Sequence, residues 1–224
     1  PIVHVITAEG GTQAMMDNVD MLSDEYRRVQ LVGLWNNAPN LILTAEKPVR
    51  SMDDLAGMNI RVPSRNAGIV VQAWGANPVS MPAPEIYNAM QTGVLDAANT
   101  SSGSMVSYRL YEQAKCLTAP GENALWFMYE PVLISKKTFD RLTPEQQQAL
   151  KDAGQRAEEW FAEQAAGLDS KMVDTFEKAG VEVVTMSPEN FDAWLKIAQD
   201  TSYKNFSNEV EGGKDLIDQA MAVE

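Results

Sequence analysis

Short apolar runs alternate with amphipathic stretches through the first half of the chain. The runs that predict strands cover residues 2–6, 29–34, 40–44, 59–62 and 94–98, and the stretches that predict helices cover 13–22, 51–55, 65–74 and a segment from about residue 84. Gly75 and Gly93 follow the last two helical stretches, where a helix C-terminus favours a left-handed residue. Strands and helices that alternate at this spacing predict βαβ units around a parallel or mixed sheet.

Helical periodicity dominates the second half of the chain. Residues 126–135 form a long apolar run that predicts one strand. The sequence TPEQ at 143–146 predicts a helix start, because it combines a capping threonine, a first-turn proline and a glutamine three residues after the cap. Apolar residues continue at helical spacing to about Ala179. They predict one helix of about 35 residues and about 50 Å, which either bends or runs from one lobe to another. A strand at 181–185 and helices from 187 and near 215–222 complete the pattern.

The chain is strongly acidic, with a formal net charge of −13 and an isoelectric point of about 4.5. A protein with this charge and no basic stripe is not expected to bind nucleic acid or an anionic membrane surface. An anionic small molecule would need a local cationic anchor, because the overall field does not attract it.

One cysteine, Cys116, and one histidine, His4, are present. This content excludes a disulfide framework, cysteine-based zinc sites and multi-histidine metal sites within the chain. No cofactor and no metal are expected. Because Cys116 lies in an apolar segment, we interpret it as a buried strand residue rather than as a reactive thiol.

The N-terminus indicates that residues have been removed. Pro1 cannot be a translational start, and neither a signal peptide nor an apolar run of membrane-spanning length is visible. Processing of an exported precursor, with its signal peptide removed, and a shortened sequence both agree with this start.

The candidate chemistry centres on the sequence MNIRVP at 58–63, in which Arg61 ends an apolar run. An arginine at the carboxyl end of a buried strand faces the crevice where open α/β sheets bind ligands. Its planar fork matches a carboxylate with two hydrogen bonds, so an organic acid is the predicted ligand. The alternative is a structural role, in which Arg61 pairs with Asp53, Asp54 or Asp96.

The order of these motifs resembles that of the substrate-binding proteins of TRAP (tripartite ATP-independent periplasmic) transporters, of the dicarboxylate-receptor type. The stretches that carry the resemblance cover residues 53–63, 75–81, 85–96, 110–112, 134–136 and 142–147. They keep their order and spacing over most of the chain. The resemblance implies a two-lobed α/β fold of the type II periplasmic binding protein kind, with mixed sheets and with crossing strands and a long helix that join the lobes.

The resemblance also implies how the chain divides. Residues 1–38 would be the remainder of lobe I, and 39–125 would form lobe II, which anchors the ligand. Residues 126–166 would return to lobe I with the spanning helix, and 167–224 would complete lobe II with the C-terminal helices. Family members are longer, and their first βαβ units have no counterpart here, so the N-terminal part of the family fold is expected to be absent.

The implied function is that of an extracytoplasmic receptor, not an enzyme. It would bind a small organic acid in an interlobe cleft in the periplasm, as a monomer, and deliver it to a TRAP membrane permease. The alternative is a hydrolase or another small-molecule enzyme on a similar α/β fold. A serine hydrolase lacks support, because no Gly-x-Ser-x-Gly sequence is present and the one histidine is His4. An interaction module that has lost its ligand is a third possibility.

The resemblance implies two ligand contacts in this chain. It also shows that two charged residues found in many family members are replaced here. Arg61 stands where the family arginine pairs with the ligand carboxylate, and Thr100 stands where many members have an asparagine. Asn99 replaces an acidic residue, which weakens the case for a metal site. Many members carry a second arginine about twenty residues before the first, where this chain has Asn40 or Leu41, and Asn40 is the candidate ligand contact at that place. A monocarboxylate is therefore favoured over a dicarboxylate.

Other residues are weaker candidates for the site. Trp35 and Trp126 could stack on the apolar body of a ligand, whereas Trp74 is predicted to lie in the core. Glu85 is a candidate site residue, although a carboxylate in a first helical turn is favourable for dipole reasons alone. Arg65 is predicted to be a solvated residue at a helix start.

Overall fold

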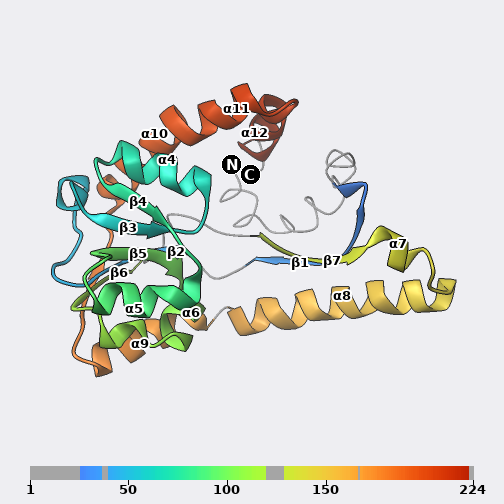
Figure 1. Cartoon of the computed structure of the whole chain (residues 1–224), viewed down its shortest axis with the longest axis horizontal. Coiled ribbons are helices and arrows are strands. Elements are labelled where there is room, and N and C mark those ends of the chain that lie inside the picture. Colours follow the sequence, from blue (N-terminus) through green and yellow to red (C-terminus); the bar gives the residue numbers. More distant parts are fainter. Residues whose placement is uncertain (1–25, 37–39, 120–128, 166, 222–224) are drawn as a thin grey trace. The chain divides into compact units, whose positions relative to one another are not determined.

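The computed structural model describes residues 26–36, 40–119, 129–165 and 167–221. The chain divides into two compact units (Figure 1). Unit 1 comprises Pro1–Asn37, Phe127–Gly167 and Ala220–Glu224, and unit 2 comprises Ala38–Trp126 and Leu168–Gln219. The assignment of these units to the predicted lobes stays a prediction. The strand expected at 2–6 and the helix expected at 13–22 lie outside the described residues.

Unit 2 is built on a six-stranded mixed sheet in the order β4-β3-β5-β2-β6-β8. The strands are β2 (Asn40–Thr44), β3 (Asn59–Val62), β4 (Asn77–Ser80), β5 (Ala97–Ser101), β6 (Cys116–Ala119) and β8 (Glu182–Thr185). β3 is parallel to β4 and β5, β6 is parallel to β8, and β2 runs antiparallel between β5 and β6. The carboxyl ends of β3, β4, β5, β6 and β8 therefore lie at one edge of the sheet, together with the start of β2.

Helices cover both faces of this sheet (Figure 1). The helices of unit 2 are η2 (Met52–Leu55), α4 (Arg65–Ala73), η3 (Ala83–Glu85), α5 (Ile86–Gln91), α6 (Ser102–Ser107), η4 (Leu110–Glu112), α9 (Leu168–Lys178), α10 (Pro188–Ala198), η5 (Gln199–Tyr203), α11 (Lys204–Glu209) and most of α12 (Gly213–Met221). Helices α5, α6 and α9 pack on one face in an apolar cluster that includes Leu43, Ala98 and Leu117. Helices α4 and α10 pack on the other face in a second cluster that includes Ile42 and Ala97. Because successive strand residues alternate between faces, neighbours such as Ala97 and Ala98 supply both clusters.

Most helix ends lie where the capping residues predict them. Ser64 caps α4, since its Oγ atom accepts from the main-chain nitrogen of Ala67 at 3.2 Å. Gly75 follows α4 with a φ of +81°, a conformation that costs glycine little. Trp74 is buried as predicted, and its ring lies 5.0 Å from that of Trp194 in α10.

The strand predicted at 94–98 is shifted in the structure, where β5 covers Ala97–Ser101. The residues just before it close the end of α5 instead. The main-chain nitrogens of Val94 and Leu95 donate to the oxygen of Ala89, and Leu95 is buried as an anchor in the core. As a result, the polar residues that follow Ala98 lie inside the strand and are buried rather than forming a loop.

The single long helix predicted from 143 to 179 is two helices, α8 (Pro144–Ala165) and α9. The predicted start is confirmed, since Thr143 and Gln146 exchange hydrogen bonds of 3.0 and 3.3 Å in a capping box. The two helices have different surroundings. No residue of α8 is buried, whereas Met172 and Phe176 of α9 are fully buried. The break falls where the chain passes from unit 1 to unit 2.

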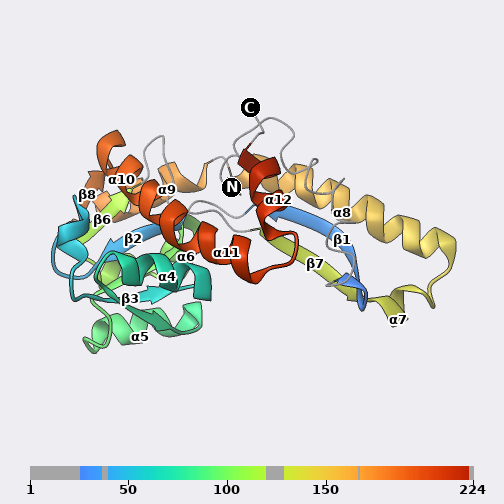
Figure 2. The same cartoon turned by 90° about the horizontal axis from the view of Figure 1, so that it is seen from above.

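The described part of unit 1 consists of two strands and two helices. The strands β1 (Val29–Asn36) and β7 (Tyr129–Ser135) pair antiparallel, with an irregularity in β1 between Leu31 and Gly33. The short helix α7 (Lys136–Phe139) follows β7, and α8 packs along β1 (Figure 2). The first residues of the strand predicted at 126–135 lie outside the described ranges.

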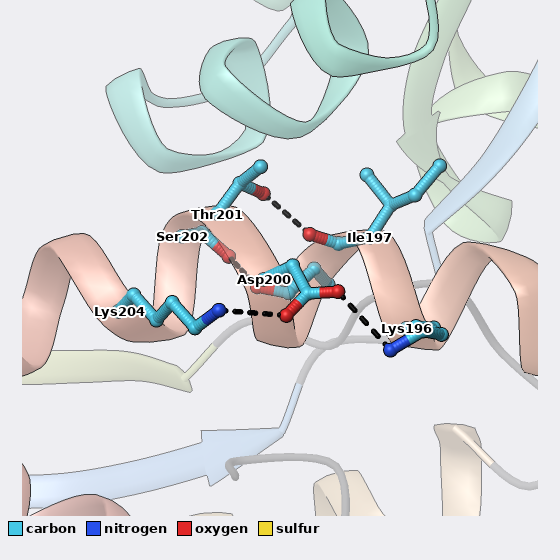
Figure 3. Close-up of polar contacts among 7 residues, drawn as sticks. Lys196, Ile197, Asp200, Thr201, Ser202 and Lys204 are labelled. Carbon is cyan, nitrogen blue, oxygen red and sulfur yellow. Dashed lines mark hydrogen bonds and ion pairs between the residues drawn. The ribbon is translucent and has the colours of Figure 1, made fainter.

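The C-terminal part of unit 2 contains a π-helical segment, η5, between α10 and α11. Figure 3 shows that Asp200 of this segment pairs with Lys196 and Lys204, one turn away on each side. The Thr201 and Ser202 hydroxyls donate to main-chain oxygens four residues earlier, a pattern that often accompanies local distortion of a helix. None of the helices in the described ranges combines the length and the apolar character that crossing a membrane requires.

Candidate functional site

The guanidinium of Arg61 lies at the carboxyl end of β3, where Pro63 ends the strand because it cannot donate to a sheet. Its Nε atom donates to the main-chain oxygen of Met81 at 3.1 Å, and its Nη1 atom donates to that of Asn99 at 2.9 Å. Arg61 is 7% exposed. Two hydrogen bonds to main-chain atoms therefore fix the plane of a largely buried cation.

The structural alternative for Arg61, an ion pair with a neighbouring aspartate, is wrong. Asp96 Oδ2 accepts from the main-chain nitrogen of Asn59 at 2.8 Å, and Asp54 accepts from main-chain nitrogens at the start of η2. In the described parts of the chain no carboxylate pairs with Arg61, and burial alone lowers the pKa of its guanidinium. Since arginine stays protonated in proteins, a buried positive charge is left without an acidic partner.

Thr100 lies in β5, the strand next to β3, and is 3% exposed. The register places Arg61 opposite Ala98, and β3 ends one residue later at Val62, so Thr100 and Ser101 extend past the end of β3. Ser101 is committed to capping, since its Oγ atom accepts from the main-chain nitrogen of Ser104 at 3.3 Å. Among the described residues, the Thr100 hydroxyl makes no hydrogen bond and remains available.

Asn99 also lies in β5 and is 4% exposed. Its main-chain oxygen accepts from Arg61, but its side-chain Oδ1 atom is buried and has no hydrogen-bond partner among the described residues. Most buried polar atoms in folded proteins are hydrogen-bonded, so this oxygen calls for an explanation. Because β3 pairs Arg61 with Ala98, the Arg61 side chain and the Thr100 hydroxyl share one face of the sheet, whereas the Asn99 acceptor lies on the face of Ala97.

The sequence matches, over residues 11–209, a family described as bacterial extracellular solute-binding protein, family 7. The chain belongs to this family. A solute-binding protein of Albidiferax ferrireducens is 41% identical over 171 residues, which is 76% of this chain and 51% of that protein. The 2,3-diketo-L-gulonate-binding periplasmic protein of Escherichia coli is 31% identical over 164 residues, which is 72% of this chain and 48% of that protein. This chain therefore spans about half the length of these two relatives.

The fold is that of a solved family member. The crystal structure of a TRAP periplasmic solute binding protein from Rhodoferax ferrireducens, with bound malonate, matches with a TM-score of 0.86 at 34% identity. The match covers 97% of this chain and 66% of that chain. The predicted fold class, a two-lobed α/β periplasmic binding protein with mixed sheets, is confirmed.

The remaining predicted site residues of this family 7 protein are not all brought together. Asn40 begins β2 and pairs with Ser101, next to Thr100. Glu85 is exposed, and its side chain has no hydrogen bond or ion pair with another described residue. Trp35 belongs to β1 in unit 1, where its side chain is not described, and Trp126 lies outside the described residues.

The surroundings of Arg65 and Cys116 indicate structural roles rather than ligand binding. Arg65 is exposed, as predicted, and pairs with Glu209 of α11 at 3.2 Å. Cys116 is a buried residue of β6, as predicted, and burial raises the pKa of its thiol. In the ranges that the structure describes, no three His, Cys, Asp or Glu side chains come close enough to hold a metal ion.

Sequence reasoning missed how Arg61 is held and what Asn99 offers. The acceptors for Arg61 are the main-chain oxygens of Met81 and Asn99, and every residue carries such an oxygen, so no sequence signal distinguishes them. Asn99 had a signal, since it is an amide that directly follows two small apolar residues. By resemblance to the family alone, Asn99 stands out only as the replacement of an acidic residue.

Proposed function

We propose that this chain is the ligand-anchoring part of an extracytoplasmic solute receptor, and that it holds a small organic acid by its carboxylate at Arg61. The observation that carries the proposal is a buried guanidinium that has no acidic partner among the described residues and is fixed by two main-chain oxygens. Membership of a solute-binding family supports a receptor over the hydrolase alternative.

The geometry of Arg61 favours an anion over a neutral ligand. Its Nε and Nη1 atoms each use a hydrogen on a main-chain oxygen, which leaves the Nη2 end of the fork for a ligand. Charge-assisted hydrogen bonds from arginine to carboxylate are among the strongest that side chains make. Because the guanidinium is held in place before the ligand arrives, little side-chain entropy is lost on binding.

The ligand class is a small carboxylate with one acid group on Arg61. The solved relative from Rhodoferax ferrireducens contains malonate, and the relative from Escherichia coli is named for 2,3-diketo-L-gulonate. Both are organic acids. Since the position about twenty residues before Arg61 holds no second arginine, we propose that this chain binds a single carboxylate by charge, and that any further polar group meets Thr100 or Asn40.

The receptor would act in the periplasm and deliver its acid to a TRAP-type membrane permease. Membership of an extracellular solute-binding family and similarity to a TRAP periplasmic solute binding protein support this location and partner. The net charge of −13 argues against nucleic acid as a partner. We expect the receptor to act as a monomer.

Binding of organic acids, measured by calorimetry and thermal unfolding, tests the proposal. A ligand at one hundred times its Kd stabilises the folded state by about 2.7 kcal/mol. We expect at least one small carboxylate to do so for the wild-type chain, and Arg61→Ala to abolish the effect. Arg65→Ala is the matched control, because Arg65 is a nearby but exposed arginine. Stabilisation that survives in Arg61→Ala, or no stabilisation across a broad panel of acids, would contradict the proposal. Turnover of an acid would favour an enzyme.

A further inference from the structure

The Arg61 anchor depends on the last residues of β5. The main-chain oxygen of Asn99 accepts from Arg61 Nη1 at 2.9 Å, and the Thr100 hydroxyl lies on the same face of the sheet as the Arg61 side chain. Thr100 and Ser101 extend past Val62, the last residue of β3, and among the described strands they pair with β2 alone. The place of this strand end therefore also depends on the residues that follow it, at the start of α6.

The start of α6 is held by α9, the helix with which the chain returns to unit 2. Ser102, the first residue of α6, is fully buried, and its hydroxyl donates to Asp169 Oδ1 in the first turn of α9. The two helix starts also approach closely, since a Cβ atom built on Gly103 would lie 3.8 Å from Leu168 Cδ1. Farther along, both helices pack in the apolar cluster on this face of the sheet (Figure 1).

The path from Ser102 to the ligand site is short. One residue, Ser101, separates it from Thr100, and the Oγ atom of Ser101 accepts from the main-chain nitrogen of Ser104 at 3.3 Å. This capping contact ties the strand end to the first turn of α6, so the two move together. Loss of the hydrogen bond at Ser102 would therefore release the helix start and the strand end at once.

Asp169 reaches the site through Ser102 and not by its charge. Burial alone lowers the pKa of Arg61, so the aspartate is not a charge partner of the anchor. Burial also raises the pKa of the Asp169 carboxyl group, and the hydrogen bond from Ser102 opposes this rise. A half-buried carboxylate without a cationic partner among the described residues costs stability. Its presence is therefore better explained by an effect on the site than by a gain in folding.

We propose that Asp169 is a positioning residue of the carboxylate site: by holding the Ser102 hydroxyl, it fixes the end of β5 beside Arg61. The proposal rests on the proposed function, since it takes the ligand carboxylate to be bound at Arg61. Because positioning depends on the hydrogen bond and not on the charge, a neutral acceptor at position 169 should serve equally well. Asparagine supplies such an acceptor in a side chain of similar shape.

Calorimetry of variants tests the proposal, with acetate, lactate, pyruvate and malonate as the probes. We expect Asp169→Ala to weaken binding of any probe that binds the wild-type chain by about three- to tenfold, the effect of one lost hydrogen bond. Addition of Asp169→Ala to Ser102→Ala should cause little further loss, because both changes remove the same bond. Asp169→Asn should bind with wild-type affinity.

Asp54→Ala is the matched control. Asp54 also accepts from a serine hydroxyl, that of Ser51 at 3.2 Å, but it lies in η2, which precedes the start of β3 at the opposite edge of the sheet. Its loss should lower the free energy of unfolding and leave the affinity unchanged. A role of Asp169 in stability alone would give the same result as this control, and would overturn the proposal.

Hydrogen exchange in the unliganded chain gives a second readout. The amides of residues 100–104 should exchange faster in Asp169→Ala than in the wild type, and at the wild-type rate in Asp169→Asn. Wild-type affinity in Asp169→Ala, or equally weak binding in Asp169→Asn, would overturn the proposal. Failure of all four acids to bind the wild-type chain would count against the proposed function instead. Unchanged exchange in Asp169→Ala would then overturn the positioning role by itself.

Discussion

The two units of the molecule differ in how many apolar side chains they bury. Every member of both apolar clusters lies in unit 2, on the two faces of its six-stranded sheet. In the described part of unit 1, the buried apolar residues are Leu34 and Phe139, and no residue of α8 is buried. Unit 2 is stabilised by side-chain burial, whereas the described part of unit 1 depends on a few close contacts between strand and helix.

Those close contacts join α8 to β1. A Cβ atom built on Gly154 would lie 1.5 Å from the main-chain oxygen of Val32, so the helix approaches the strand at a distance that only glycine permits. One turn later, Glu158 Oε1 accepts from the main-chain nitrogen of Leu34 at 2.5 Å. Val32 lies at the irregularity of β1 and is the residue that has no register partner in β7.

The difference explains why the anchor belongs to unit 2. A buried cation and a buried free acceptor each cost free energy, and only an element with a large apolar core can hold them in place. In the described ranges, the buried side-chain atoms without a partner are in Trp74, Asn99 and Trp194, all in unit 2. Unit 2 has enough core to tolerate them.

Removal of a large core side chain from unit 2 gives the largest expected effect. Phe176 of α9 is fully buried, and its ring meets that of Tyr111 edge-on at 5.9 Å. Phe176→Ala should lower the free energy of unfolding by about 3–5 kcal/mol, through lost burial and the cavity that remains. Hydrogen exchange should show lost protection throughout β2, β5 and β6. Trp160→Ala in unit 1 is the control, because that side chain is exposed and its loss should be nearly silent.

Addition of a single methyl group at Gly154 tests the close contact between helix and strand in unit 1. Gly154→Ala should destabilise the packing of α8 on β1 by about 1–3 kcal/mol, because the main-chain oxygen of Val32 cannot move as a side chain can. The gain in helix propensity, about 1 kcal/mol, is too small to reverse the sign. Gly167→Ala is the control, since nothing lies within 4 Å of its added Cβ atom.

Hydrogen exchange distinguishes the two outcomes for Gly154→Ala. Loss of protection confined to β1, β7 and α8, with unit 2 unchanged, would support separate stabilisation of the units. Equal loss in β2 and β5 would contradict it, since the units would then unfold together.

The predictable parts of the fold are those that local chemistry decides. Ser64 and Gly75 mark the ends of α4 because capping and left-handed φ depend on single residues, and the bounds of β2 and β3 follow from short apolar runs. The predicted start of β5 at residue 94 is wrong because Leu95 is apolar for a different reason: it is buried in the core at the end of α5. The predicted single helix is wrong because apolar periodicity continues across the break between α8 and α9, whereas the break lies at the boundary between the two units.

In the candidate site, the sequence predicts Arg61 but not the hydrogen-bonding state of its neighbours. Arg61 stood out because a charged residue at the end of an apolar strand is unusual. The availability of Asn99 Oδ1 was hidden, since it depends on what does not approach it in three dimensions. Side chains whose role depends on missing partners cannot be recognised from a linear pattern.

The smallest expected effect concerns Asp169, the second residue of α9, where the chain returns to unit 2. It accepts a hydrogen bond from the Ser102 hydroxyl, and its half-buried position raises the pKa of its carboxyl group above the ordinary 3.8. The folded state therefore favours the protonated form. The stability that this contributes is complete below pH 3.8 and is lost as the pH rises through the folded pKa. Asp169→Asn keeps an acceptor for Ser102 and removes the titration, so it should gain stability over the wild type as the pH rises through this window, by about 1 kcal/mol or less.

Asp54 provides the control of opposite sign. The main-chain nitrogens of Arg50 and Ser51 donate to its carboxylate and lower its pKa below 3.8. Its stabilisation is therefore present above pH 3.8 and is lost as the pH falls through the folded pKa. Thermal unfolding from pH 3 to 7 should show that Asp54→Asn costs stability most at the upper end, where Asp169→Asn gains it. If the stabilities of the two variants changed with pH in parallel, burial of the Asp169 carboxylate would carry no free-energy cost in the folded state. The proposed difference between the two aspartates would then be wrong.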